Sequence, residues 1–402
     1  MTPLPREARW GSGQIKNLAE VALGKMLQSN NSGDDTYANY MRAANVQPDG
    51  VLMLEPKQMW FSEKELDALT LRRGDVVVVE GGVGGYGRAA YLSEDLEGWG
   101  FQNSINRLRP AAHTDGRFLA YYLIALRAAG FIERYCNVVS MPHLTAEKLA
   151  AIPVPIPPAD EQRAIADYLD RETARIDTLI AEQQQLVEIL RLRKRAVLDG
   201  LTATAEGPRV RLKYLFEQSS EANYPGEEVL SVYRDYGVIP KSSREDNFNR
   251  TPENTSRYLL VQPGDVVINR MKAWQGSLGV SEHRGIVSGD YEVVRPIGDR
   301  LLPRFTHLYL RSPMMIAEYA VRSTGIRPSQ WRLYWDQLGN IEVPVPTRVQ
   351  QAAIVERADE QTAKIDMLIA ETERFIELSR ERRSALITAA VTGQIDVPGE
   401  VA

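Results

Sequence analysis

The sequence predicts an α+β protein made of two similar halves, each a mixed α/β segment followed by one long helix. The phrase TARIDTLIAEQ (173–183) returns as TAKIDMLIAET (362–372), within a longer repeated stretch. Each repeated stretch runs for roughly 40 residues without glycine or proline, whereas strand-sized apolar runs precede it. At 402 residues the chain also exceeds what one hydrophobic core ordinarily supports.

Composition narrows the class of protein. Apolar content of 44% and charged content of 25% are those of a soluble globular chain. The opening residues show no secretory signal pattern, no apolar run is long enough to span a membrane, and Cys136 is the single cysteine. We therefore expect a cytoplasmic protein with no membrane association, no disulfide framework and no cysteine-based zinc site.

Charge is distributed unevenly along the chain. The net charge of −5 argues against a protein that holds nucleic acid by bulk charge alone. Most of the acidic excess lies in the two repeated helical stretches, whereas residues 208–346 are slightly basic. Any contact with a polyanion is therefore expected from the mixed segments.

The first mixed segment, residues 1–158, contains a buried-type strand in GDVVVV (74–79) and an amphipathic helix over 116–135. Between them lies the glycine-rich stretch EGGVGGYGRAAY (80–91). It lacks the Gly-Lys-Ser/Thr of a phosphate loop. A flexible hairpin and a loop that lets backbone approach a large anion both remain open.

The second mixed segment, residues 208–346, has a corresponding strand in GDVVIN (264–269) and a corresponding predicted helix over 303–323. Its densest candidate surface is STGIRPSQWRLYWDQLGN (323–340), where arginines alternate with aromatic residues. Guanidinium groups pair with phosphates and with guanine edges. Some of the aromatic side chains, Trp335 above all, fit equally well in a core.

The repeated stretches, residues 159–207 and 347–402, carry helix start and stop signals. Pro157 and Pro158 precede the first, and Thr347 with Gln350 has capping-box spacing before the second. Gly200 and Gly393 stand where each helix is expected to end.

Apolar residues follow a heptad period of 3.5 along both helices, which predicts a seam that a partner helix covers. Two seams in one chain most simply cover each other, although packing of each helix on its own segment remains possible. The predicted seam residues are Ile165, Leu169, Ile176, Leu179, Leu186, Leu190, Ile354, Ile365, Leu368 and Phe375. Ile180 and Val187, echoed by Ile369 and Ile376, widen the stripe.

Catalytic patterns are missing from the sequence. It contains no His-Glu-x-x-His, no Gly-x-Ser-x-Gly, no Walker loop and no Asn/Asp-Pro-Pro-Tyr/Phe turn for amino-group methylation. The four histidines are scattered. We therefore predict neither a catalytic residue nor a metal site.

Several of these landmarks together resemble the specificity subunit of type I restriction–modification enzymes. They are the proline-rich entrances IPVPIPP (152–158) and IEVPVPT (341–347), the long helices that follow them, and RRSALITAAVTGQID (382–396). The resemblance implies two target-recognition domains separated by two long antiparallel coiled-coil helices in a pseudo-two-fold repeat. It also implies that the helices act as a spacer.

By this resemblance the chain is a non-catalytic subunit that reads a bipartite site in double-stranded DNA. Two methyltransferase subunits and restriction subunits would use S-adenosylmethionine, ATP and Mg²⁺ for adenine methylation and cleavage, and this chain would bind none of these cofactors. The candidate DNA contacts are Tyr86, Arg88, Arg270, Lys272, Arg322, Arg327, Gln330 and Arg332. Two alternatives stay open: a specificity protein of a restriction enzyme outside type I, and a coiled-coil scaffold without DNA function.

Overall fold

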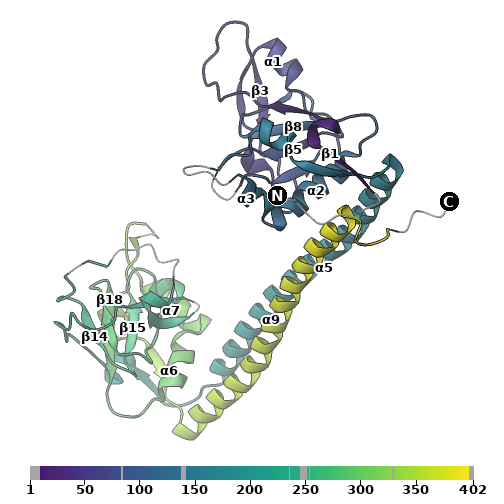
Figure 1. Cartoon of the computed structure of the whole chain (residues 1–402). Coiled ribbons are helices and arrows are strands. Elements are labelled where there is room, and N and C mark those ends of the chain that lie inside the picture. Colours follow the sequence, from purple (N-terminus) through teal and green to yellow (C-terminus); the bar gives the residue numbers. More distant parts are fainter. Residues whose placement is uncertain are drawn as a thin grey trace. The chain divides into compact units, whose positions relative to one another are not determined.

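The computed structural model describes residues 10–82, 85–136, 142–234, 236–244, 251–252, 254–327 and 330–397. The predicted α+β class with two long helices is confirmed (Figure 1). Two compact units form, one from residues 1–184 with 374–402 and one from residues 185–373. Each combines a mixed domain with half of each long helix, so the four segment boundaries predicted from sequence stay a prediction. Parts of the stretches 80–91 and 323–340 discussed above lie outside the described residues.

In the first unit the mixed domain consists of nine short strands and four short helices among the described residues. The strands are β1 (Gly11–Gln14), β2 (Ala19–Leu23), β3 (Thr36–Met41), β4 (Gln58–Phe61), β5 (Val76–Val79), β6 (Ala89–Tyr91), β7 (Trp99–Phe101), β8 (Ile105–Pro110) and β9 (Pro153–Ile156). The helices are α1 (Glu63–Ala68), α2 (Gly116–Ala128), α3 (Phe131–Tyr135) and α4 (Ala146–Ala150). The main sheet is antiparallel, in the order β2-β8-β5-β6; β4-β3-β7 form a second sheet and β1 pairs with β9.

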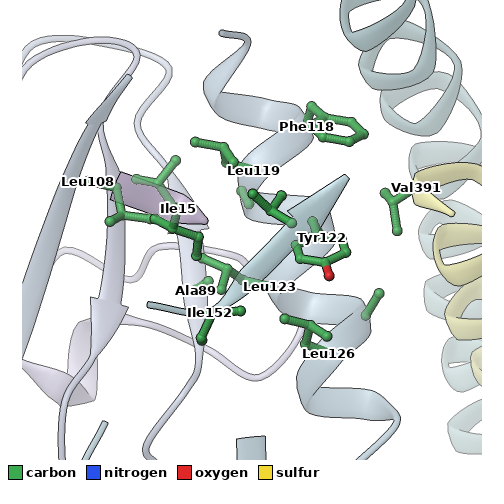
Figure 2. Packing of buried hydrophobic residues seen from close by; sticks show 14 of the residues in the cluster. Ile15, Ala89, Leu108, Phe118, Leu119, Tyr122, Leu123, Leu126, Ile152 and Val391 are labelled. Carbon is green, nitrogen blue, oxygen red and sulfur yellow. The ribbon is translucent and has the colours of Figure 1, made fainter. Parts of the chain in front are cut away.

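The valine run of β5 explains why both faces of the main sheet are covered. All four side chains, Val76 to Val79, are fully buried. Successive side chains of a strand point to opposite faces. Val76 and Val78 accordingly pack in the cluster that contains α2, whereas Val77 and Val79 belong to a cluster on the other face. Figure 2 shows the first of these clusters, in which Leu119 and Leu123 of α2 face Ala89 and Leu108 of the sheet.

The second unit repeats this architecture. Its strands are β10 (Arg209–Arg211), β11 (Phe216–Gln218), β12 (Leu230–Tyr233), β13 (Gly237–Pro240), β14 (Leu259–Val261), β15 (Val266–Asn269), β16 (Leu278–Val280), β17 (Gly285–Val287), β18 (Tyr291–Pro296) and β19 (Glu342–Pro344). Its helices outside the long pair are α6 (Pro303–Leu310), α7 (Pro313–Arg322) and α8 (Trp335–Leu338). The main sheet has the order β11-β18-β15-β16, and β10 pairs with β19 as β1 pairs with β9. Strand for strand, the two main sheets correspond.

Two helices predicted as continuous are each broken in the structure. The stretch 116–135 divides into α2 and α3 because Gly130 takes a left-handed conformation, with φ of 67°. The stretch 303–323 divides into α6 and α7 at Ser312, whose hydroxyl accepts from the backbone N–H of Met315, and Pro313 follows as the first helical residue. In each case a local helix boundary interrupts the stretch, although the amphipathic pattern of apolar residues continues through it.

The long helices are α5 (Ala159–Ala203) and α9 (Arg348–Val391). The capping box before α9 is confirmed: Thr347 N donates to Gln350 Oε1 at 3.0 Å, and Gln350 N donates to Thr347 Oγ1 at 3.4 Å. Gly393 ends its helix with φ of 73°. Gly200 was the wrong endpoint for α5, since Leu201 packs against the second unit's core and extends the helix beyond the glycine.

In the first unit, α5 and α9 run antiparallel. Arg383 of α9 pairs with Asp177 of α5 at 2.9 Å. Further toward the end of α9, Ile387 and Val391 share one core cluster with Leu169 near the start of α5. Residue numbers therefore fall along one helix as they rise along the other. Figure 2 shows Val391 on the side of the cluster where α9 approaches α2.

The second unit has the same antiparallel arrangement. Arg191 of α5 pairs with Glu373 of α9 at 3.0 Å, and Lys194 pairs with Asp366 at 2.6 Å. Both pairs are half-exposed, so they contribute to register more than to stability.

The predicted seam residues do not all lie between the helices. Five are buried, namely Ile165, Leu169, Leu190, Ile354 and Ile365, and two are half-buried, namely Ile176 and Leu179. The assignment of Leu186, Leu368 and Phe375 was wrong, because these side chains are 40%, 48% and 42% exposed.

The seam passes instead one residue further along the chain, through Val187 and Ile376. A heptad alternates steps of three and four residues, and both 186–187 and 375–376 are apolar pairs. The period alone therefore did not decide which member of each pair faces the partner helix.

Neighbouring residues of α9 test this corrected seam. Ile365 is 6% exposed, whereas Leu368 is largely open to water. Ile365→Ala is expected to lower the free energy of unfolding of the second unit by about 2–4 kcal/mol, because it leaves a cavity. Leu368→Ala should cost less than about 1 kcal/mol, since little burial is lost. Urea unfolding of the full chain measures both, and equal costs would contradict the corrected seam.

His307 of α6 makes the second unit sensitive to acid. Burial, aided by Arg311 and Arg304, lowers the pKa of His307 to about 4. The unfolded chain, with a pKa near 6.5, binds this proton first, so the contribution is complete above about pH 6.5 and is lost as pH falls toward 4. The loss reaches about 3 kcal/mol. His307→Gln should flatten the fall in urea midpoint between pH 7 and pH 5; an unchanged slope would show that other groups cause it.

Candidate nucleic-acid interface

In the second unit, two chain segments far apart in sequence meet beyond the end of β15. The backbone N–H of Leu333 donates to the carbonyl of Arg270 at 2.9 Å. Trp274 and Trp331 meet edge to face, with ring centroids 5.4 Å apart. The loop after β15 and the segment after α7 thus form one surface, and most of the basic residues predicted for this unit lie on these two segments.

The predicted side chains on this surface differ in availability. Lys272, Arg327 and Gln330 are exposed, and Arg332 is half-buried. These four are the candidates whose geometry suits a ligand approaching from solvent.

Arg270 and Arg322 are engaged within the protein. The Arg270 guanidinium donates to the carbonyl of Gly289 and lies 3.9 Å from the carboxylate of Glu292, which is itself buried. Arg322 forms an ion pair with Glu318 one helical turn earlier. The prediction that both are direct DNA contacts is weakened, since each would have to give up a partner.

In the first unit, Tyr86 and Arg88 are half-buried. Tyr86 packs against the main core, and this burial raises the pKa of its hydroxyl. Arg88 lies close to Arg127, whose pKa is lowered by burial and then by the charge of Arg88. Both side chains are therefore less open to solvent than Lys272, Arg327 and Gln330 of the second unit.

The first unit has a different polar pair at the equivalent place. Here the backbone N–H of Leu144 donates to the carbonyl of Glu80, as Leu333 does to Arg270. His143 Nδ1 lies 3.0 Å from Glu80 Oε2, and the imidazole is 45% exposed. Gly81 lies beside it, and a Cβ there would lie 2.5 Å from His143 Nδ1, so the imidazole would have to shift. Sequence reasoning missed this pair. Aligning the two mixed segments at Leu144 and Leu333 places His143 opposite Arg332.

A second missed feature lies on the β12–β13 hairpin. The Arg244 guanidinium lies 5.3 Å from the Tyr233 ring centroid and 4.7 Å from that of Tyr236. The two rings meet edge to face, and Tyr236 is 60% exposed. Stacked arginine and tyrosine occur both in cores and at nucleic-acid surfaces. The sequence signal is weak, since Arg244 is separated from the tyrosines by a strand.

Among the described residues, no group of three or more His, Cys, Asp or Glu side chains is placed to hold a metal ion. No helix within the described ranges is long and apolar enough to cross a membrane.

Comparison with known proteins gives consistent matches. The family described as type I restriction modification DNA specificity domain matches residues 7–189. The specificity subunit of the type I restriction enzyme EcoBI from Escherichia coli is 23% identical over 305 residues. Over these residues the chain is similar to specificity subunits of type I restriction–modification systems. The corresponding subunit of StySPI from Salmonella potsdam is 20% identical over 190 residues.

The matches differ in coverage. The two curated specificity subunits align with 64% and 45% of this chain, and the chain spans 61% and 40% of their lengths. A chain from a study of complex assembly and conformational transition of the type I R-M system has a TM-score of 0.71 at 15% identity, covering 97% of this chain and 99% of its own. The HsdS subunit from Thermoanaerobacter tengcongensis has a TM-score of 0.53 at 18% identity, covering 97% and 98%. These structures share the fold.

The family match covers the first unit's mixed domain and the start of α5. The second unit repeats the strand order of the first, β11-β18-β15-β16 after β2-β8-β5-β6. Both units therefore share one fold.

Alanine variants of the exposed residues separate two kinds of DNA contact. If Lys272, Arg327 or Gln330 contacts a base, its removal should relax one half-sequence by about 1–3 kcal/mol. If it contacts phosphate, affinity should fall alike on all sequences and the salt slope should decrease by about one. Binding of the assembled complex to half-site libraries at several salt concentrations measures both. Arg300→Ala, exposed elsewhere on the same unit, is the control; if the three variants behave like it, this surface is misassigned.

Proposed function

We propose that the chain is the non-catalytic subunit that reads a bipartite DNA target and directs methylation and restriction by partner subunits. The observation that carries the proposal is the duplication: two mixed domains with the same strand order, each leading into its own long helix. Two equivalent readers suit a target in two parts. A single contiguous site would need only one.

The different chemistry at equivalent positions supports two different half-sequences. The first unit has His143, paired with Glu80, where the second has Arg332, and Arg270 beside it is held by Gly289 and Glu292. Carboxylates accept from the amino groups of cytosine, whereas arginine donates to guanine. Two copies of one fold with different side chains at one place read unlike sequences.

Partner subunits are the proposed source of the chemistry. Adenine N6-methylation would use S-adenosylmethionine in methyltransferase subunits, and restriction would use ATP and Mg²⁺ in restriction subunits. This part rests on the family resemblance and on the missing catalytic sequence patterns. Because its proposed target is cellular DNA, the proposal places the chain in the cytoplasm.

Exposed apolar side chains on the long helices supply a docking surface for the methyltransferase subunits. In the second unit these are Leu186, Ile189, Leu192, Met367 and Leu368, and in the first unit Phe375 and Leu378. Large aliphatic and aromatic residues in water are costly, and clusters of them mark interaction sites. Their position outside the seam leaves them available to a further helix.

Methylated motifs in genomic DNA test the proposal. Cells that carry this gene with its genomic neighbours should show adenine methylation at two short half-sequences separated by a fixed gap. The purified chain with S-adenosylmethionine, ATP and Mg²⁺ should leave the same DNA unchanged. A contiguous motif, or turnover by the chain alone, would contradict the proposal; failure of any complex to bind DNA specifically would favour a scaffold.

A further inference from the structure

Each unit joins its mixed domain to a long helix through one buried glutamine. Gln162, in the first turn of α5, is 1% exposed, and Gln351, in the first turn of α9, is 0% exposed. The two occupy equivalent positions of the sequence repeat. A fully buried amide must have its hydrogen-bonding groups satisfied, so its partners fix its surroundings.

Gln162 bridges three parts of the first unit. Its Oε1 accepts from the backbone N–H of Asp115, just before α2, at 3.1 Å. Its Nε2 donates to the carbonyl of Pro157, in the entrance to α5, at 2.9 Å. The start of α2, the proline-rich entrance and the first turn of α5 are thus held by one side chain.

Gln351 makes the same connections in the second unit. Its Oε1 accepts from the backbone N–H of Leu302, just before α6, at 2.7 Å. Its Nε2 donates to the carbonyls of Arg300 at 2.9 Å and Pro346 at 2.8 Å. The equivalent elements meet at the equivalent residue, so the joint was duplicated together with the domain.

An arginine next to each glutamine adds a second connection. Arg117 of α2 contacts Asp170 of α5 at 2.9 Å, and Arg304 of α6 contacts Asp359 of α9 at 2.8 Å. Burial alone would lower the pKa of Arg117, but the hydrogen bonds that it donates to Asp115 and other carboxylates outweigh burial and raise the pKa. Each mixed domain is therefore attached to its long helix at two points, about two helical turns apart.

We propose that Gln162 and Gln351 are positioning residues that hold each reader at a fixed angle to its helix and thereby restrict the gap between the half-sequences. The inference rests on the proposed bipartite function. The new element is that the preference for one gap length between the half-sequences depends on these two joints as well as on the long helices. Neither glutamine touches DNA in this role.

The geometry of DNA explains why the joint has to be stiff. One extra base pair in the gap moves a half-site by about 3.4 Å along the duplex and rotates it by roughly 35°. A reader that could tilt on its helix would accommodate part of that change. The buried glutamine and the more exposed arginine–aspartate pair of each reader together resist both the tilt and the rotation.

The test uses the full chain assembled with its methyltransferase. Its substrates are DNAs that carry both half-sequences with gaps from two base pairs shorter to two longer than the native gap. Gln162→Met and Gln351→Met keep the side-chain length but remove the bridging hydrogen bonds. We expect the preference for the native gap over gaps one base pair different to fall roughly tenfold, the effect of a lost pair of buried hydrogen bonds. The half-sequences should stay unchanged.

Matched controls are Arg163→Ala and Arg357→Ala, which alter exposed residues of α5 and α9 near the joints. They should keep the parent's gap profile. A normal profile for the methionine variants, whatever their melting temperature, would overturn the proposal, as would a change in half-sequences. If the methionine variants fail to fold, Arg117→Gln and Arg304→Gln decide by the same measurement. A parent complex that methylates no bipartite site would instead show that the proposed function is wrong.

Discussion

The apolar seam along α5 and α9 is the constraint on which the rest of the structure depends. In the first unit Leu169 is covered partly by the mixed domain and partly by Ile387 and Val391, which come from the other end of the chain. Burying each such side chain contributes roughly 1.5–3 kcal/mol. The first unit is therefore incomplete until the last helix has been made, and its stability is tied to a segment that follows the second unit in sequence.

The two repeated domains keep the same buried ion pair in their cores, whereas their outward-facing loops differ. Asp75 pairs with Arg109 at 2.7 Å in the first unit, and Asp265 pairs with Arg295 at 3.1 Å in the second. Both carboxylates are almost fully buried, so loss of either arginine would leave a buried charge unpaired. The loops that follow β5 and β15 differ in their polar pairs, since Glu80 pairs with His143 in the first unit and Arg270 lies near Glu292 in the second.

How far the sequence determines this structure depends on how local each feature is. Capping at Thr347 and the strand run at Val76 follow from neighbouring residues and were predictable. The choice between Leu186 and Val187 for the seam was not, because both are apolar and only the partner helix selects one. The candidate site shows the same limit: Arg270 looks free in sequence, but its partner Glu292 lies on another strand.

If the two units read DNA as proposed, sequence reading and affinity are divided between this chain and its partners. A chain of net charge −5 gains little from bulk attraction to DNA, so in this proposal most of the phosphate contact comes from partners. Phosphate contacts fix register, and contacts to base edges carry the sequence information. A pair such as Glu80–His143 can then be exchanged for an arginine without loss of overall affinity. Such an exchange keeps the affinity only if the altered loop stays at the same place relative to its helix. In our proposal the buried joints at Gln162 and Gln351 hold it there, however much the loop sequences differ.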